Sequence, residues 1–270
     1  MMILIMAMTI TTMVMKVLIK LNEANMKITY ISHSGFLIEW ENCYWLFDYF
    51  KGEIPVMNPD KKLFVFVSHK HEDHYNPDIF HLSKSNKDVQ YLLSSDIKLG
   101  DKEINKLGLD SDLLNCVHSI KPCGKYECFD QDNNIIAVNT LKSTDCGVAF
   151  LLHYQGRTIY HSGDLNLWLW KDETKQYNNN MKANFDKEMK ALKDITIDIA
   201  LVPLDPRQEE CYYKGLKGLL DVAKVRYVFP MHYWEQSDII KQFKKEWPMY
   251  SNNTLIMEIN QEGQQWDLDT

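Results

Sequence analysis

The chain has 270 residues, enough for one large domain with a sizeable hydrophobic core. Its content of 45% hydrophobic and 25% charged residues is ordinary for a globular protein in water. The formal net charge of −7 argues against a protein that binds nucleic acids by general attraction to phosphate.

The N-terminal 25 residues differ from the rest of the chain. They open with fifteen uncharged residues rich in Met and Ile, and they lack the charged start and the cleavage site of a signal peptide. This run is also shorter than the roughly 20 apolar residues of a membrane span. Because the strand-like segment KITYISHSGFLIEW begins directly after Met26, we expect residues 1–25 to be an extension outside the fold, which a misassigned start codon would explain. We expect one domain over residues 26–270.

The following stretch predicts short β-strands separated by turns. The continuous apolar run at 63–67 is typical of a strand that is covered on both faces. Pro77 fits the first turn of a short helix at 76–82, and Gln155-Gly156 fits a tight hairpin turn. The strands expected in this part are 27–31, 36–40, 44–47, 63–67, 89–93, 135–139, 147–154 and 158–160.

The C-terminal part of the chain adds helices. The polar segment QYNNNMKANFDKE reads as an insertion on the surface. Helical spacing predicts helices at 182–192, 216–223 and 237–247, and apolar runs predict strands at 197–202, 225–229 and 254–259.

The segment VFVSHKHEDHYNP, residues 65–77, concentrates three of the nine histidines directly after an apolar run. Alternate residues of an extended chain point the same way, so His69 and His71 can face one metal ion. Asp73 and His74 follow in a tight loop and can face a second ion. Imidazole and carboxylate are ligands that zinc, iron and manganese accept.

Two later segments supply ligand-type residues in equivalent positions. In TIYHSGDLN, Asp164 follows the strand expected at 158–160. In YVFPMHYW, His232 follows the strand expected at 225–229. The sequence therefore places metal-binding residue types after three separate strands.

This order of strand, His-x-His-x-Asp-His, Gly-Asp and late His resembles the metallo-β-lactamase superfamily, over residues 27 to about 259. The resemblance implies an α/β fold, a four-layered αβ/βα sandwich with a metal centre between two sheets. It also implies ligands for two ions: His69 and His71 for the first, Asp73, His74 and His232 for the second, and Asp164 as a bridge. IYHSGD and PMHYW are most similar to the branch that holds ascorbate-6-phosphate lactonase and N-acyl-phosphatidylethanolamine phospholipase D.

One departure from the superfamily pattern concerns the first metal. The family places a further histidine in the loop that reads NTLKSTDCGVAF here, and this loop contains none. Asp145 is a candidate substitute, and Ser143 stands where a histidine could be introduced. Without a substitute, the first site should bind its ion more weakly than the second. His161 is expected to orient a ligand rather than to bind metal.

Four other residues are conspicuous but less specific. His33, in HSGFLIEW, is interpreted as a turn histidine that packs locally. Trp168 and Trp170 would either form a wall of the substrate cleft or pack in the core. Tyr233 directly follows His232, and its hydroxyl is a weaker candidate for a role near the metal.

These features together predict a metal-dependent hydrolase that acts on a small molecule, with zinc as the first candidate metal and manganese or iron as alternatives. Asp73 would hold the second ion and would also accept a proton if only one ion binds. Iron-dependent redox chemistry on the same fold, or a partly degenerate binding protein, are the alternative functions. Six cysteines without paired spacing indicate reduced thiols in a cytoplasmic protein without a membrane span, and the sequence does not indicate its oligomeric state.

Overall fold

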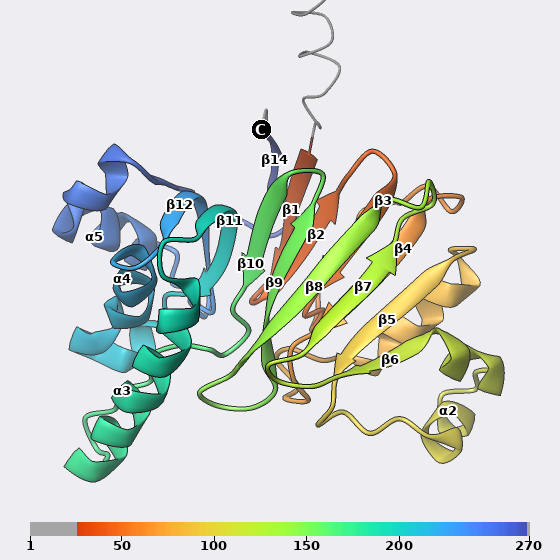
Figure 1. Ribbon diagram of the computed structural model, residues 1–270, viewed down its shortest axis with the longest axis horizontal. Coiled ribbons are helices and arrows are strands. Elements are labelled where there is room, and N and C mark those ends of the chain that lie inside the picture. Colours follow the sequence, from red (N-terminus) through yellow and green to blue (C-terminus); the bar gives the residue numbers. More distant parts are fainter. Residues whose placement is uncertain (1–25, 269–270) are drawn as a thin grey trace, which may run out of the picture.

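The computed structural model describes residues 26–268, which form two mixed sheets packed face to face with helices on their outer sides (Figure 1). The first sheet has the order β14 (Gln265–Leu268), β1 (Met26–Ser32), β2 (Gly35–Glu39), β3 (Cys43–Phe47), β4 (Lys62–Val67), β5 (Val89–Ser94) and β6 (Val117–Ile120). The second has the order β13 (Leu255–Ile256), β12 (Lys224–Met231), β11 (Thr196–Pro203), β10 (Arg157–His161), β9 (Val148–Tyr154), β8 (Ile135–Lys142) and β7 (Lys125–Phe129).

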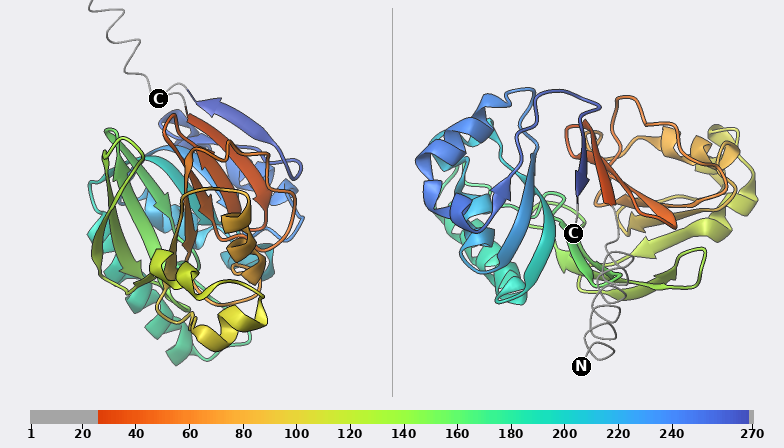
Figure 2. Two further views of the ribbon diagram at one scale, coloured as in Figure 1. Left: turned by 90° about the vertical axis from the view of Figure 1, so that its right-hand side faces the viewer. Right: turned by 90° about the horizontal axis from the view of Figure 1, so that it is seen from above.

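Helices complete the outer layers. Beside the first sheet lie η1 (Pro77–Lys84), α2 (Asp101–Lys106) and η2 (Ser111–Cys116). The second sheet carries α3 (Lys175–Met189), α4 (Lys214–Leu220) and α5 (Asp238–Glu246), with the short turns η3 (Lys190–Leu192), η4 (Pro206–Cys211) and η5 (Pro248–Asn252) between the longer elements. Figure 2 shows the two halves from the side and from above. The expected four-layered αβ/βα sandwich is confirmed.

β4 illustrates why a fully apolar strand is needed inside such a sandwich. Phe64 and Phe66 point between the sheets, where the Phe66 ring lies 5.4 Å from the ring of Phe150 in β9. Leu63, Val65 and Val67 point the other way, into a second apolar cluster that includes residues of η1 and α2. Both faces of the strand are therefore buried, as the continuous apolar run predicted.

Several sequence-based assignments differ from the structure. The segment QYNNNMKANFDKE is not a surface insertion but lies within α3. Its polar composition concealed two signs of a helix, the Thr174 N-cap and the apolar positions Met181 and Phe185, which are buried. The strand expected at 254–259 shrinks to two residues, and the last strand is β14, which pairs with β1. β6, β7 and α2 were not predicted, because their partly exposed residues lack a strong apolar pattern.

No helix among residues 26–268 is long and apolar enough to cross a membrane. The extension predicted at residues 1–25 lies outside the described residues. The described fold begins with β1, whose Met26 pairs with Leu268 of β14. β1 thus joins the two ends of the described chain in one sheet.

A chain shortened to begin at Met26 is expected to unfold at the same temperature as the full chain and to bind the same amount of metal, because its first strand pair remains intact. Circular dichroism melting and elemental analysis of both proteins measure this. Loss of soluble expression on truncation would instead show that residues 1–25 belong to the fold.

Candidate metal centre

Ligand-type side chains follow the ends of strands that run in the same direction. In the first sheet, His33 follows β1, Asp48 follows β3, and the His69 segment follows β4. In the second sheet, Asp164 follows β10 and Asp205 follows β11, while His232 follows β12. Because the carboxyl ends of parallel strands meet at one edge of a sheet, two packed sheets bring all these residues to one place.

The candidate ligands form two clusters whose ligand atoms lie within 4.8 Å of one another. The first cluster is His69, His71, Asp145 and Asp164. The second cluster is His33, Asp73, His74 and His232. His69 Nε2 lies 3.1 Å from His71 Nδ1 in the first cluster, and His33 Nε2 lies 3.3 Å from Asp73 Oδ2 in the second.

Asp164 lies between the two clusters. Its Oδ2 is 3.6 Å from His69 Nε2 of the first cluster. Its Oδ1 is 3.1 Å from His74 Nε2 and 3.5 Å from His232 Nε2 of the second cluster. One carboxylate can therefore offer one oxygen to an ion on each side, which is the position of a bridging ligand.

Within residues 26–268, four buried ligand atoms at this centre make no hydrogen bond, although they lie close to one another, in part as ion pairs. They are His33 Nε2, His74 Nε2, His232 Nε2 and Asp164 Oδ1. An unsatisfied buried polar atom costs about 1–3 kcal/mol, so four that converge on one place require a compensating partner. A divalent cation satisfies all four at once, and the donor set of imidazole and carboxylate fits such an ion.

Two buried carboxylates fix the orientation of the histidines. His74 Nδ1 donates to Asp48 Oδ2 at 2.7 Å, and His232 Nδ1 donates to Asp205 Oδ2 at 2.8 Å. Asp48 also accepts from the Ser68 hydroxyl at 2.6 Å. These bonds place the proton of the neutral imidazole on Nδ1 and direct each Nε2 at the centre, as expected for histidines that bind a metal.

The electrostatics of the centre favour positive charge. Although burial opposes its ionisation, the imidazoles of His74 and His232 hold the pKa of Asp164 well below its ordinary value. Burial likewise opposes charge on His74, yet Asp164 and Asp48 raise the pKa of that imidazole. By contrast, burial lowers the pKa of His69 to about 4, with a further contribution from His74. The carboxylates thus stabilise a cation here.

The backbone is strained at three of these positions. His33, Asp48 and His232 have positive φ angles of 52°, 38° and 62°. Residues other than glycine rarely adopt this backbone conformation, which costs on the order of 1–3 kcal/mol per residue. The main-chain N–H of His232 bonds to the carbonyl of His33 at 3.3 Å, so the two sheets hold these turns together.

A glycine allows the Asp145 loop to approach β4. A Cβ on Gly147 would lie 2.0 Å from Ser68 O and 2.6 Å from His69 Cβ. Gly147 also has a φ of 69°. Any side chain here must displace the segment that carries His69.

Gly147→Ala is therefore expected to destabilise the protein by about 3 kcal/mol or more, because backbone strain and overpacking add. Gly156→Ala is the matched control: Gly156 has a φ of 77°, but a Cβ there meets nothing within 4 Å. The control should be destabilised by about 1–2 kcal/mol, from backbone strain alone. Urea unfolding of both variants measures the difference, and equal losses would contradict the close approach.

All six ligand candidates taken from the sequence lie in the two clusters. Asp145 joins the first cluster, with its Oδ2 3.4 Å from His71 Nδ1. Ser143 is not in it; its hydroxyl accepts from the Asp145 N–H at 3.1 Å. His161 lies outside both clusters, where it accepts from Gly163 N and donates to Ser34 O.

His33 is the ligand-type residue that the sequence reading missed. His33 does lie in the turn between β1 and β2, as interpreted, but the expected local packing is wrong, because its ring lies 4.2 Å from that of His232, about 200 positions away in the sequence. No signal within HSGFLIEW marks it, since its neighbours come from other strands. Asp48 and Asp205 were also missed, although each directly follows a predicted strand or a buried run.

Two cavities reach the centre. One, of about 250 Å³, is lined by His71, Asp73, Asp145, Asp164 and His232, together with Trp168, Trp170, Tyr177, Met181 and Arg207. We call it the metal cleft. Trp168 is buried within it and donates to Asp164 O at 2.9 Å, so it both packs and forms a wall.

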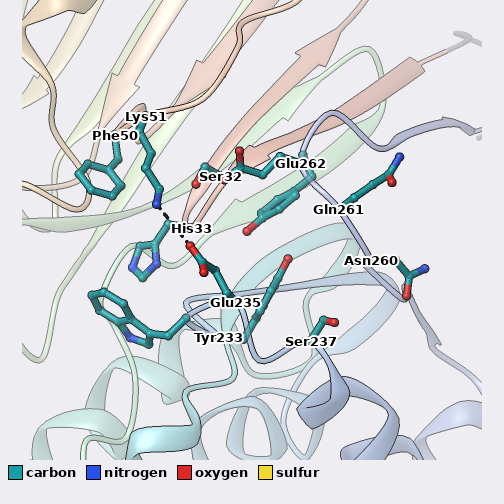
Figure 3. Close-up of a pocket in the computed structure, with 12 residues that line it drawn as sticks. Ser32, His33, Phe50, Lys51, Tyr233, Glu235, Ser237, Asn260, Gln261 and Glu262 are labelled. Carbon is teal, nitrogen blue, oxygen red and sulfur yellow. Dashed lines mark hydrogen bonds and ion pairs between the residues drawn. The ribbon is translucent and has the colours of Figure 1, made fainter.

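The second cavity, of about 690 Å³, touches the clusters only through His33. Figure 3 shows it between the turn after β1 and the Glu235 loop, with the Lys51–Glu235 ion pair across it. Tyr233 lines this cavity and stacks on Tyr30 at 5.8 Å. Tyr233 therefore faces away from the metal cleft, against a direct role of its hydroxyl there.

Comparison with known proteins agrees with this geometry. The family model described as the β-lactamase superfamily domain matches residues 27–232. A UPF0173 metal-dependent hydrolase of Carboxydothermus hydrogenoformans is 28% identical over 220 residues, which cover 77% of this chain and 84% of that protein.

Two solved structures share the fold. Igni18, a metallo hydrolase of Ignicoccus hospitalis, has a TM-score of 0.60 at 16% identity and covers 91% of this chain and 99% of its own. CmlA, a diiron β-hydroxylase of Streptomyces venezuelae, has a TM-score of 0.56 at 10% identity and covers 92% and 54%. The family model matches most of the chain, and the chain folds into the expected two-sheet sandwich. The chain therefore belongs to the metallo-β-lactamase superfamily.

Proposed function

We propose that this protein is a hydrolase that holds two divalent metal ions between its sheets and cleaves a small-molecule ester, lactone, thioester, amide or phosphodiester. The convergence of four buried ligand atoms that make no hydrogen bond within residues 26–268 carries the proposal. The relative named as a metal-dependent hydrolase supports the same class of reaction.

We assign the first ion to His69, His71 and Asp145, and the second ion to Asp73, His74, His232 and His33, with Asp164 shared between them. Each ion would then have at least four protein ligands, and residues of both clusters line the metal cleft. Asp145 supplies the oxygen that the sequence pattern left missing. This removes the main argument for a degenerate binding protein.

The chain's own residues prepare the reaction. A bound divalent ion supplies Lewis acidity, which lowers the pKa of a coordinated water to about 7 and polarises the oxygen of the electrophile. Asp48 and Asp205 keep His74 and His232 in the ligand tautomer. Trp168 and Trp170, stacked at 5.9 Å, form one side of the cleft and restrict the approach of solvent and substrate.

Asp73 is better suited to bind a metal ion than to act as a base. Its Oδ2 lies within 3.8 Å of the ring nitrogens of His33, His74 and His232. Burial opposes its ionisation, yet the nearby imidazoles of His232 and His33 hold its pKa far below the ordinary value. A carboxylate with so low a pKa accepts a proton poorly, so we assign Asp73 to metal binding first.

The metal cleft is small, which favours a small-molecule substrate over a polymer.

Zinc remains our first candidate metal because histidines dominate the second cluster. Iron-dependent redox chemistry rests only on a shared fold with CmlA. Cytoplasmic location, the lack of nucleic-acid binding, and the narrower branch within the superfamily stay predictions from the sequence.

Elemental analysis of the purified protein, followed by assays on ester, lactone, thioester, amide and phosphodiester substrates, tests the proposal. We expect up to two ions per chain and hydrolysis that a chelator abolishes and added metal restores. Iron with no hydrolysis would support the redox alternative. Protein that binds no metal after reconstitution would contradict the proposal.

A further inference from the structure

One cationic side chain in the metal cleft has no part in the metal clusters. Arg207 lines the cleft beside the candidate ligands, and 46% of its side chain is exposed. The other charged residues of the lining are the ligand candidates Asp73, Asp145 and Asp164, along with two histidines. Arg207 is thus the permanent positive charge of this lining.

The structure holds Arg207 in a fixed orientation. Its Nε and Nη2 donate to both oxygens of Asp205, with Nε 3.0 Å from each oxygen. Asp205 is fully buried, and its Oδ2 also accepts from His232 Nδ1 at 2.8 Å. A single carboxylate therefore connects the guanidinium to a ligand of the second cluster.

Two indole rings flank the same guanidinium. Its Cζ lies 4.4 Å from the ring of Trp234 and 5.9 Å from that of Trp170. Trp234 Nε1 donates to Asp205 at 3.2 Å, so this wall is tied to the same carboxylate. Such packing limits the rotamers of Arg207 and reduces the entropy lost when it binds a ligand.

Within residues 26–268, the hydrogen bonds of this guanidinium leave from Nε and Nη2. The edge that includes Nη1 can therefore bind another group. Guanidinium matches carboxylate and phosphate in a bidentate geometry. We propose that Arg207 determines specificity by binding an anionic group, a carboxylate or phosphate, of a substrate whose scissile bond lies at the metal centre. This rests on the proposed function.

Binding of small dianions to metal-loaded protein tests the proposal without an activity assay. Dicarboxylates from succinate to adipate are compared by calorimetry with monocarboxylates of the same chain length, from butyrate to hexanoate. Both members of each pair can bind the metal, but only the dicarboxylate has a second anion for Arg207. We expect at least one dicarboxylate to bind about tenfold more tightly than its partner.

Arg207→Gln is expected to remove this preference, and Arg207→Lys to keep part of it. Lys171→Gln, which removes an exposed positive charge outside the cleft lining, should leave it unchanged. 3-Phosphonopropionate in place of succinate shows whether phosphate-like or carboxylate groups bind better.

Two results would overturn the role of Arg207. The first is a dicarboxylate preference that is absent, or that persists in Arg207→Gln. The second is loss of metal from Arg207→Gln, which would mean that the residue only supports Asp205. Wild-type protein that loads no metal would instead contradict the proposed function.

Discussion

Asp164→Ala is expected to abolish binding of both metal ions. Asp164 places Oδ2 3.6 Å from His69 of the first cluster and Oδ1 3.1 Å from His74 of the second. It is also buried, so water cannot readily replace its carboxylate. Loss of an orienting partner alone typically costs 10–100-fold in metal affinity or activity, and loss of a shared ligand should cost at least 100-fold. Metal content after dialysis and the hydrolysis rate measure the effect.

Asp145→Ala serves as the control for Asp164→Ala, because Asp145 contacts the first cluster alone. This variant should lose affinity for one ion and retain the other. His232→Ala should likewise lose the ion of the second cluster. If Asp164→Ala kept one tightly bound ion, its assignment as a bridge would be wrong.

Asp145→His is expected to strengthen zinc binding at the first cluster by about tenfold, because imidazole suits zinc better than a half-exposed carboxylate does. In the wild type we expect zinc to bind in two steps. The second cluster, with three mostly buried histidines, should fill before the first, in which His71 and Asp145 are 43% and 44% exposed. Calorimetric titration of the metal-free protein resolves the two steps.

The contacts of Ser143 make Asp145→His a better variant for the zinc titration than Ser143→His. From the sequence, Ser143→His looks suitable, but Ser143 is buried and its hydroxyl accepts from the Asp145 N–H. A histidine there would remove the bond that orders the Asp145 loop. Ser143→Ala is a useful comparison, since it loses the bond but keeps the carboxylate. Asp145→His with unchanged zinc affinity would show that residue 145 is not a ligand.

Much of the fold follows from local patterns. β4 is a continuous apolar run after Lys62, and β11 and β12 each end in a buried apolar run. Their carboxyl ends lead into His69, Asp205 and His232. Polar elements were harder to recognise: α3 has few apolar residues, and only its buried positions reveal the face that packs on the sheet. β14 was missed because a four-residue edge strand is defined by its partner β1 rather than by its own pattern.

The sequence by itself determined the superfamily and the residues of the His-x-His-x-Asp-His motif, because those ligands lie close together along one segment and their types are specific to metal chemistry. Asp164 and His232 could be added because each directly follows a recognisable strand. Only the tertiary structure decided the rest. His33, Asp145 and Arg207 have ordinary local sequences, and they meet the metal clusters or their cleft because two packed sheets bring distant strand ends within a few ångströms. Proximity of that kind is set by packing between elements, which no local pattern encodes.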